Sequence, residues 1–143
     1  MRSLAITICL LFGLASTAAA NVAKDERGWF CGTSEDWELA SLRAGSKVVM
    51  NNFFYEEKSS AATNMTVLAI KYSVINRSGA KYRMSSQFVG YDKAGMVTFA
   101  ISVSPVFQLV TEGASTSAND IYVDGPVLAG TAKICTAFAA QSM

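Results

Sequence analysis

The chain has 143 residues, of which 51% are hydrophobic and 16% are charged, with 12 Lys and Arg against 11 Asp and Glu. This length predicts a single domain, and the composition excludes a disordered tail. A net charge of +1 gives no basic excess to neutralise phosphates, which argues against a nucleic-acid partner. The sequence contains no His, so catalysis or zinc binding that needs an imidazole is excluded. None of these numbers points to a specific activity.

Residues 1–20 have the three parts of a secretory signal peptide. Arg2 supplies the positive charge, residues 4–14 are apolar, and the segment ends in three alanines that fit a signal peptidase site. The apolar run is about half of the roughly 20 residues that a membrane-spanning helix needs, so an uncleaved anchor is the less favoured alternative. We therefore predict a bacterial protein, periplasmic or secreted, whose mature part is one domain, residues 21–143, without stable membrane insertion.

The cysteines predict one disulfide. Cys9 lies inside the apolar run and follows Ile8, where a lipidation site would need a small residue, so lipidation is rejected. Cys31 and Cys135 remain, and an exported pair is usually bridged. Such a bridge would close a loop of about 100 residues and tie the N-terminal segment to the last strand. The alternative, a redox pair, lacks a C-x-x-C motif.

A short helix is expected near the start of the mature chain. Thr33 or Ser34 is placed to cap it, with Asp36 as the capping-box partner of Thr33 three residues later. Glu35, Asp36 and Glu38 are then stabilised by the helix dipole. The alternative is that these acids form an acid–base cluster, but a helix N-terminus favours the ionised carboxylate, whereas such catalysis needs a displaced pKa.

An irregular strand is predicted over residues 47–55. Its alternation is broken at Asn51 and Asn52, which indicates a β-bulge. Residues 56–64 are polar and small without a period, and this predicts a solvated loop.

The centre of the chain alternates apolar and polar residues over segments 66–75, 82–91 and 96–107, which predicts three half-buried strands. Four-residue turns at 76–79 and 92–95, each ending in Gly, join them. Strands joined by short turns usually pair with each other, so we expect an antiparallel meander. Its apolar face requires a second layer, and the fold class is therefore all-β, a sandwich with one short helix.

The last third of the chain gives weaker signals. Residues 111–119 are rich in Ser, Thr, Ala and Gly and predict a loop, and residues 121–123 predict a short strand before a turn at 124–126. Residues 127–139 are mixed in period. We interpret them as a final strand with a bulge at Gly130; a helix is the alternative.

Two segments carry a family resemblance. Residues 72–79, YSVINRSG, and residues 88–95, FVGYDKAG, resemble the strand-and-turn units of small exported immunoglobulin-like β-sandwich modules, and are most similar to FxLYD-type domains of bacterial exported proteins. The similarity covers about residues 66–110. It implies an immunoglobulin-like antiparallel sandwich with a binding or structural role and no catalytic residues.

The sequence offers one group of residues for contact with a partner. Phe53, Phe54 and Tyr55 form an aromatic cluster, and exposed aromatics dominate interaction hot spots. The alternative, favoured by the area that aromatics need to bury, is that they fill one end of the core. We identify no catalytic residue, no metal ligand set and no cofactor motif.

We therefore expect an exported, non-enzymatic binding module that recognises an unidentified protein partner through an exposed strand edge or through residues 53–55. A secreted effector or virulence-associated factor that acts on a host cell is the alternative. A hydrolase that uses carboxylates alone is less favoured, because it needs two acidic groups about 5–10 Å apart across a cleft.

Overall fold

The computed structural model describes residues 21–143 except 45–46, 62, 64 and 106–108; of residues 44, 114–118 and 120 it describes only the backbone. The predicted signal peptide, residues 1–20, lies outside the described residues. The elements are β1 (Ala23–Lys24), β2 (Phe30–Gly32), α1 (Ser34–Glu38), β3 (Leu42–Ala44), β4 (Val48–Ser59), β5 (Thr66–Asn76), β6 (Tyr82–Tyr91), β7 (Val97–Val103), β8 (Leu109–Val110), β9 (Gly113–Val123), the 3-10 turn η2 (Leu128–Gly130) and β10 (Lys133–Ser142).

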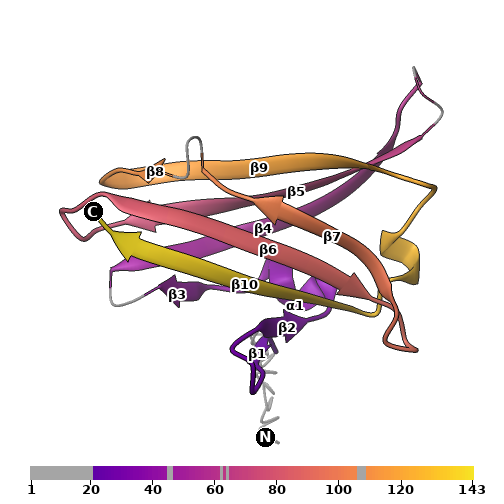
Figure 1. Cartoon of the computed structure of the whole chain (residues 1–143), viewed down its shortest axis with the longest axis horizontal. Helices are drawn as coiled ribbons and strands as arrows, with labels where there is room; N and C mark the ends of the chain where they lie inside the picture. The colour runs from indigo at the N-terminus through magenta and orange to yellow at the C-terminus, as the bar shows by residue number, and fades with distance from the viewer. Residues whose placement is uncertain (1–20, 45–46, 62, 64, 106–108) are drawn as a thin grey trace, which may run out of the picture.

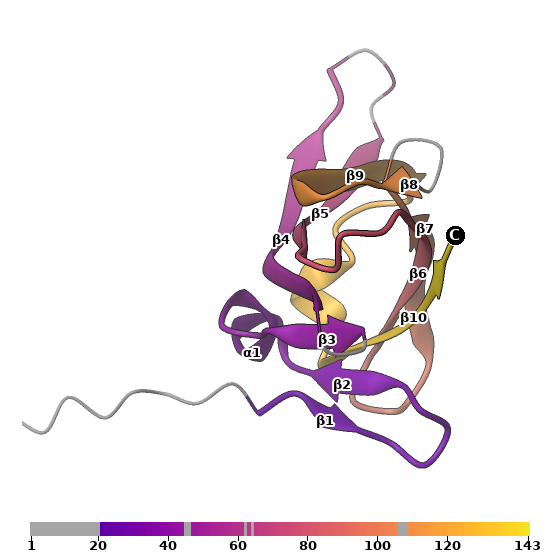
Figure 2. The same ribbon diagram turned by 90° about the vertical axis from the view of Figure 1, so that its left-hand side faces the viewer.

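The strands form two antiparallel sheets packed face to face (Figures 1 and 2), so the predicted all-β sandwich with one short helix is confirmed. One sheet has the order β1-β2-β10-β6-β7, with β8 also paired to β6. The other has the order β3-β4-β5-β9. The core between them is apolar and contains the aromatic side chains of Trp37, Phe53, Tyr72, Phe88 and Phe99.

All three central segments contain a strand, although the third, predicted over residues 96–107, ends at Val103. The predicted meander is wrong. β6 pairs with β7, whereas β5 lies in the opposite sheet between β4 and β9. The connection at residues 76–81 therefore crosses from one sheet to the other. Asn76 fixes this crossing: its buried side-chain amide donates hydrogen bonds to the carbonyls of Ala80, Val110 and Thr111, and its oxygen accepts from Ser78. These contacts replace the strand pairing that a hairpin turn would give.

Two segments expected to be loops are strands. β4 continues through residues 56–59, and β9 occupies most of the segment 111–119, because both pair with β5 along its length. Glu57 is therefore not a solvated loop residue. Its carboxylate accepts hydrogen bonds from the backbone N–H groups of Val127 and Leu128, at 2.6 and 2.8 Å, and so holds η2 against the sandwich.

Two local features predicted from the sequence, a β-bulge and a helix capping box, are present in the structure. The register of β4 shifts between Asn51 and Phe54, with Asn52 at a positive φ of 53°, so the predicted bulge is confirmed. The capping box of α1 is also confirmed, since Thr33 accepts from the backbone of Asp36 while the Asp36 carboxylate accepts from the backbone of Thr33. The Thr33 hydroxyl also donates to the Asp36 carboxylate, at 2.7 Å, and this bond together with that from the Thr33 backbone N–H lowers the pKa of the Asp36 carboxyl.

The final segment differs from its prediction only at its start. Gly130 belongs to η2 rather than to a bulge, and the strand that follows is β10. The chain crosses between sheets again on either side of β9, because β9 lies beside β5 while β10 lies beside β6.

Candidate interaction site

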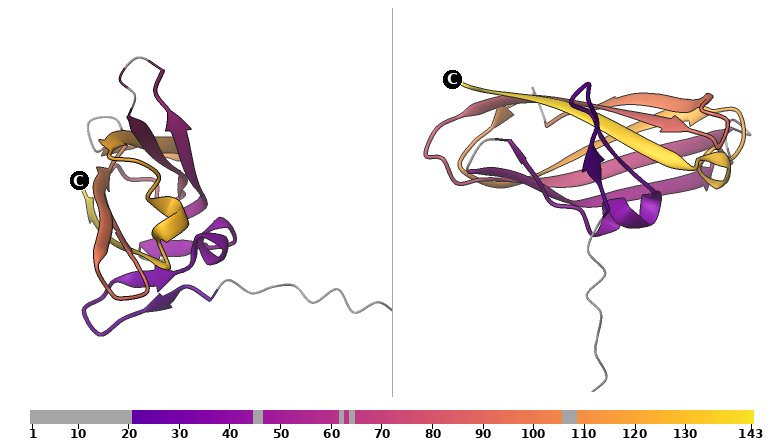
Figure 3. Two further views of the ribbon diagram at one scale, coloured as in Figure 1. Left: turned by 90° about the vertical axis from the view of Figure 1, so that its right-hand side faces the viewer. Right: turned by 90° about the horizontal axis from the view of Figure 1, so that it is seen from below.

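The second half of β10 has a free backbone edge. β6 pairs with β10 along its whole length, but on the opposite edge β2 covers only Ile134, Cys135 and Thr136. Among the strands that the structure describes, none pairs with residues 137–142 on this side. Figure 3 shows the β1–β2 hairpin beside one part of β10, with the strand continuing past it to the C-terminus.

β2 covers no residue of β10 beyond Thr136, because the chain turns away from β10 at the β1–β2 hairpin. The carboxylate of Asp25 accepts hydrogen bonds from the backbone N–H groups of Arg27 and Trp29, and the Asp25 N–H donates to the Trp29 carbonyl. Gly28 supplies the positive φ of 86° that this turn requires. The residues that would extend β2 along β10 are therefore held in the hairpin with β1.

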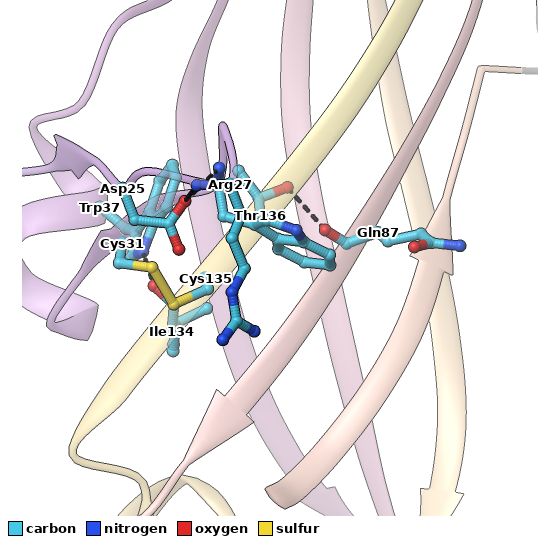
Figure 4. The surroundings of a disulfide bond; sticks show 9 residues. Asp25, Arg27, Cys31, Trp37, Gln87, Ile134, Cys135 and Thr136 are labelled. Carbon is cyan, nitrogen blue, oxygen red and sulfur yellow. Dashed lines mark hydrogen bonds between the residues drawn. A yellow bond between two sulfur atoms is a disulfide. The ribbon is translucent and has the colours of Figure 1, made fainter. Parts of the chain in front are cut away.

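β2 itself is fixed to β10 by a disulfide. Cys31 and Cys135 are directly opposite each other and bonded, with their Cα atoms 4.1 Å apart, so the predicted bridge is confirmed (Figure 4). Trp37 adds a second anchor, because its ring packs in the core and its indole N–H donates to the Ile134 carbonyl at 2.9 Å. This end of the β10 edge is permanently occupied.

Alternation along the strand determines which backbone groups the free part presents. The Met143 N–H donates to the Lys81 carbonyl across the β10–β6 pair, so the odd-numbered residues of β10 direct their N–H and C=O groups toward β6. The even-numbered residues direct theirs to the opposite edge, as the contact of the Ile134 carbonyl with Trp37 illustrates. Phe138, Ala140 and Ser142 therefore present their N–H and C=O groups at the free edge.

The side chains on this part of β10 are small or apolar. Phe138 and Ala140 point inward and are packed against the core, and the Phe138 ring stacks on Phe30 of β2 with centroids 5.5 Å apart. Ala139 and Gln141 are exposed on the outer face of the sheet. No charged residue occurs between Ile134 and Met143. The free edge therefore lacks the charges and prolines with which proteins usually prevent unwanted strand pairing.

The other sheet edges differ from the free edge of β10. β3 carries Arg43, and the uncovered part of β4 carries two Glu residues and Lys58. β7 has no charge, but its edge faces β9, where the Asn119 amide donates to the Ser102 carbonyl at 2.6 Å. The free part of β10, residues 137–142, has neither a charged side chain nor a strand paired to it on this side among the described residues.

The aromatic cluster predicted from the sequence does not form one surface. Phe53 is buried in the core, where its ring contacts Trp37. Phe54 points to the other face, is 47% exposed and lies beside Lys71, whose ammonium is 5.9 Å from the ring centroid. Tyr55 returns to the core side and packs against Phe88. Only Phe54 of the three is available to a partner.

Within the part of the chain that the structure describes, no three His, Cys, Asp or Glu side chains gather in a way that suits a metal ion. The same residues contain no helix long and apolar enough to cross a membrane.

Comparison with known proteins adds no relative: no family model matches the chain, and neither a curated protein nor a solved structure matches it significantly. The geometry of the chain itself is therefore the basis for a function.

The sequence predicts an exposed strand edge in general, but it does not identify the edge of β10. The available signal was the charge-free run from Ile134 to Met143. This run indicates a free edge only where β2 stops pairing with β10. That position is set by the β1–β2 hairpin and not by the sequence of β10.

Proposed function

We propose that this protein is an exported, non-enzymatic interaction module of a bacterium. In this proposal it recognises a partner protein by adding an extended segment of that partner to the free edge of β10. The observation that carries the proposal is the six-residue stretch 137–142, which is paired on one side only and is free of charge and proline. Strand addition of this kind takes its affinity from backbone hydrogen bonds and its specificity from alternate side chains.

The rest of the chain is consistent with a rigid recognition scaffold. β5 lies between β4 and β9, and β6 lies between β10 and β7, an order that supports an immunoglobulin-like arrangement of the kind implied by the FxLYD resemblance. The Cys31–Cys135 disulfide supports export, since such bonds persist mainly in oxidising compartments. The edge itself is held in place by this bond and by the pairing with β6.

The partner segment would lie in line with β2 and continue past Thr136. Its inward-facing side chains would meet Phe30, Phe138 and Ala140, which favours apolar or small residues at alternate positions. Its outward-facing positions are next to Ala139 and Gln141 and carry no such restriction.

Photo-crosslinking in intact source cells tests the proposal. A photoreactive amino acid is placed at Gln141, beside the free edge, and in a control at Lys93, in the exposed β6–β7 turn. We expect an adduct with a different protein from position 141 and not from position 93. The adduct should disappear in an Ala140→Pro background, which removes an edge N–H, and persist with Ala140→Ser, which keeps it. An adduct that survives Ala140→Pro, or no adduct with another protein, refutes the proposal.

A further inference from the structure

An uncharged strand edge exposed to solvent is a hazard as well as a recognition site. Such edges pair with any compatible strand, including another copy of the same protein, unless charge, proline or a covering segment prevents it. The structure provides none of these for the free part of β10 among its described residues. At high protein concentration, the nearest compatible strand for this edge is the same edge of another copy.

We propose that a second copy of this chain covers the edge, through antiparallel pairing of β10 with β10 about a two-fold axis at Ala140. This inference rests on the proposed function in that both use the same edge, and the self-paired form is the state from which a partner would displace one copy. The interaction is isologous, so each copy contributes the same residues.

The positions of the edge groups fit this symmetry. Phe138, Ala140 and Ser142 present the free N–H and C=O groups, and they are evenly spaced about Ala140. In the two-fold register Ala140 lies opposite Ala140 of the second copy, and Phe138 lies opposite its Ser142. Every free backbone group of the stretch then has a counterpart in the pair.

The side chains and the hairpin allow the approach. A two-fold axis brings identical side chains near each other, so a charged edge would repel itself, but β10 has no charge after Lys133. On the outer face Ala139 lies opposite Gln141 of the second copy, and neither is bulky enough to keep the backbones apart. The register uses residues 137–143 and stops at Thr136, where β2 begins to cover the edge, so the second copy does not compete with β2 for the same backbone groups.

The contact is small, because it joins two strand edges and little else. Interfaces of this size belong to the weak and transient class, so the dimer should form at high protein concentration and dissociate on dilution. Weak pairing suits a site that must still become available to a partner.

Sedimentation analysis over a range of concentrations tests the inference with purified, disulfide-intact protein. We expect a reversible monomer–dimer equilibrium for the unaltered protein and for Ala140→Ser. In the two-fold register Ala140→Pro removes one N–H from each copy, and thus two hydrogen bonds, so the dissociation constant should rise roughly tenfold or more. The fold of this variant should survive, because the N–H of Ala140 faces away from β6 and has no bond within the sheet.

A second variant keeps the test independent of proline. Ala139→Lys together with Gln141→Lys places two pairs of like charges directly opposite each other in the proposed register, and should weaken dimerisation in low salt more than in high salt. Ser85→Lys, exposed on the neighbouring strand β6, is the control and should have a much smaller effect. A protein that is monomeric at all concentrations, or a dimer insensitive to both edge variants, overturns the inference.

Cysteine pairing checks the register directly. Ala139→Cys and Gln141→Cys are expected to form an intermolecular disulfide when the two single variants are mixed, and much less when either is oxidised alone.

The experiments can refute either proposal without refuting the other. A monomer that still gives a partner adduct at position 141 removes only the self-pairing, and an edge-dependent dimer without such an adduct removes only the recognition of another protein.

Discussion

Removing the hydroxyl groups of two buried tyrosines should change the stability of the fold in opposite directions. The reason is that one hydroxyl is hydrogen-bonded within the described part of the chain and the other is not. The Tyr55 hydroxyl is buried beside the core and has no hydrogen-bond partner among the described residues. The Tyr72 hydroxyl lies 2.8 Å from Ser86 Oγ and donates to the Val103 carbonyl at 3.2 Å. A buried hydroxyl without a partner costs about 1–3 kcal/mol, whereas a satisfied one contributes about 1 kcal/mol.

Tyr55→Phe should therefore raise the free energy of unfolding by about 1–2 kcal/mol, and Tyr72→Phe should lower it by about 1 kcal/mol. Urea denaturation at neutral pH, followed by tryptophan fluorescence under conditions that keep the disulfide, measures both changes. The two variants are matched in chemistry, since each loses one oxygen and leaves a ring of the same shape in the same core.

The pH dependence gives a second signature for Tyr55. Burial raises the pKa of its phenol well above the ordinary value of about 10. Because the folded pKa is higher than the unfolded one, the stability of the native state is intact below about pH 10 and is lost as the pH rises above it. The free energy of unfolding should then fall by about 1.4 kcal/mol per pH unit from this group, and Tyr55→Phe should abolish that part of the slope.

Either of two results would refute this argument. One is a loss of stability in Tyr55→Phe comparable to that in Tyr72→Phe, which would mean that the Tyr55 hydroxyl has a partner of its own. The other is an unchanged slope above pH 10, which would mean that the phenol ionises as freely in the folded protein as in the unfolded chain.

Three further changes test the scaffold by urea denaturation. Replacing Cys31 and Cys135 together by Ser should cost up to about 4–5 kcal/mol, the loop-entropy value for a sequence separation of 104 residues, and a loss below 1 kcal/mol would contradict it. Gly90→Ala would place a Cβ 2.3 Å from an aromatic ring carbon on β7 and should cost about 1–3 kcal/mol, whereas Gly130→Ala meets open space and should be nearly neutral. Glu57→Ala should cost about 1.5–3 kcal/mol by freeing two backbone N–H groups of η2; Glu57→Gln keeps an acceptor oxygen and should cost less.

Local features of this chain could be predicted because their causes are local. The bulge at Asn51 and Asn52, and the capping box of Thr33 and Asp36, depend on residues within a few positions of each other. The disulfide joins residues far apart in the sequence, and it could be predicted because residues 21–143 contain a single pair of cysteines.

Sheet membership could not be predicted in the same way. The turn after β5 looks like a hairpin turn, and only the contacts of Asn76 with residues 110 and 111, far along the chain, make it a crossing. β9 has the composition of a loop and becomes a strand because β5 offers an edge of the right length. The interaction site has the same origin, since the free edge of β10 exists because β2 turns away after pairing with three residues.

The crossing at Asn76 has a consequence for how the protein can be made. Residues 76–78 spell N-x-S, the acceptor signal for N-linked glycans, and the sugar is attached to the same amide nitrogen that binds three backbone carbonyls here. A glycan added during translocation would occupy this nitrogen before the sheets close, and the fully buried position has no room for it. Secretion through a eukaryotic pathway should therefore yield misfolded material unless that signal is removed at Ser78.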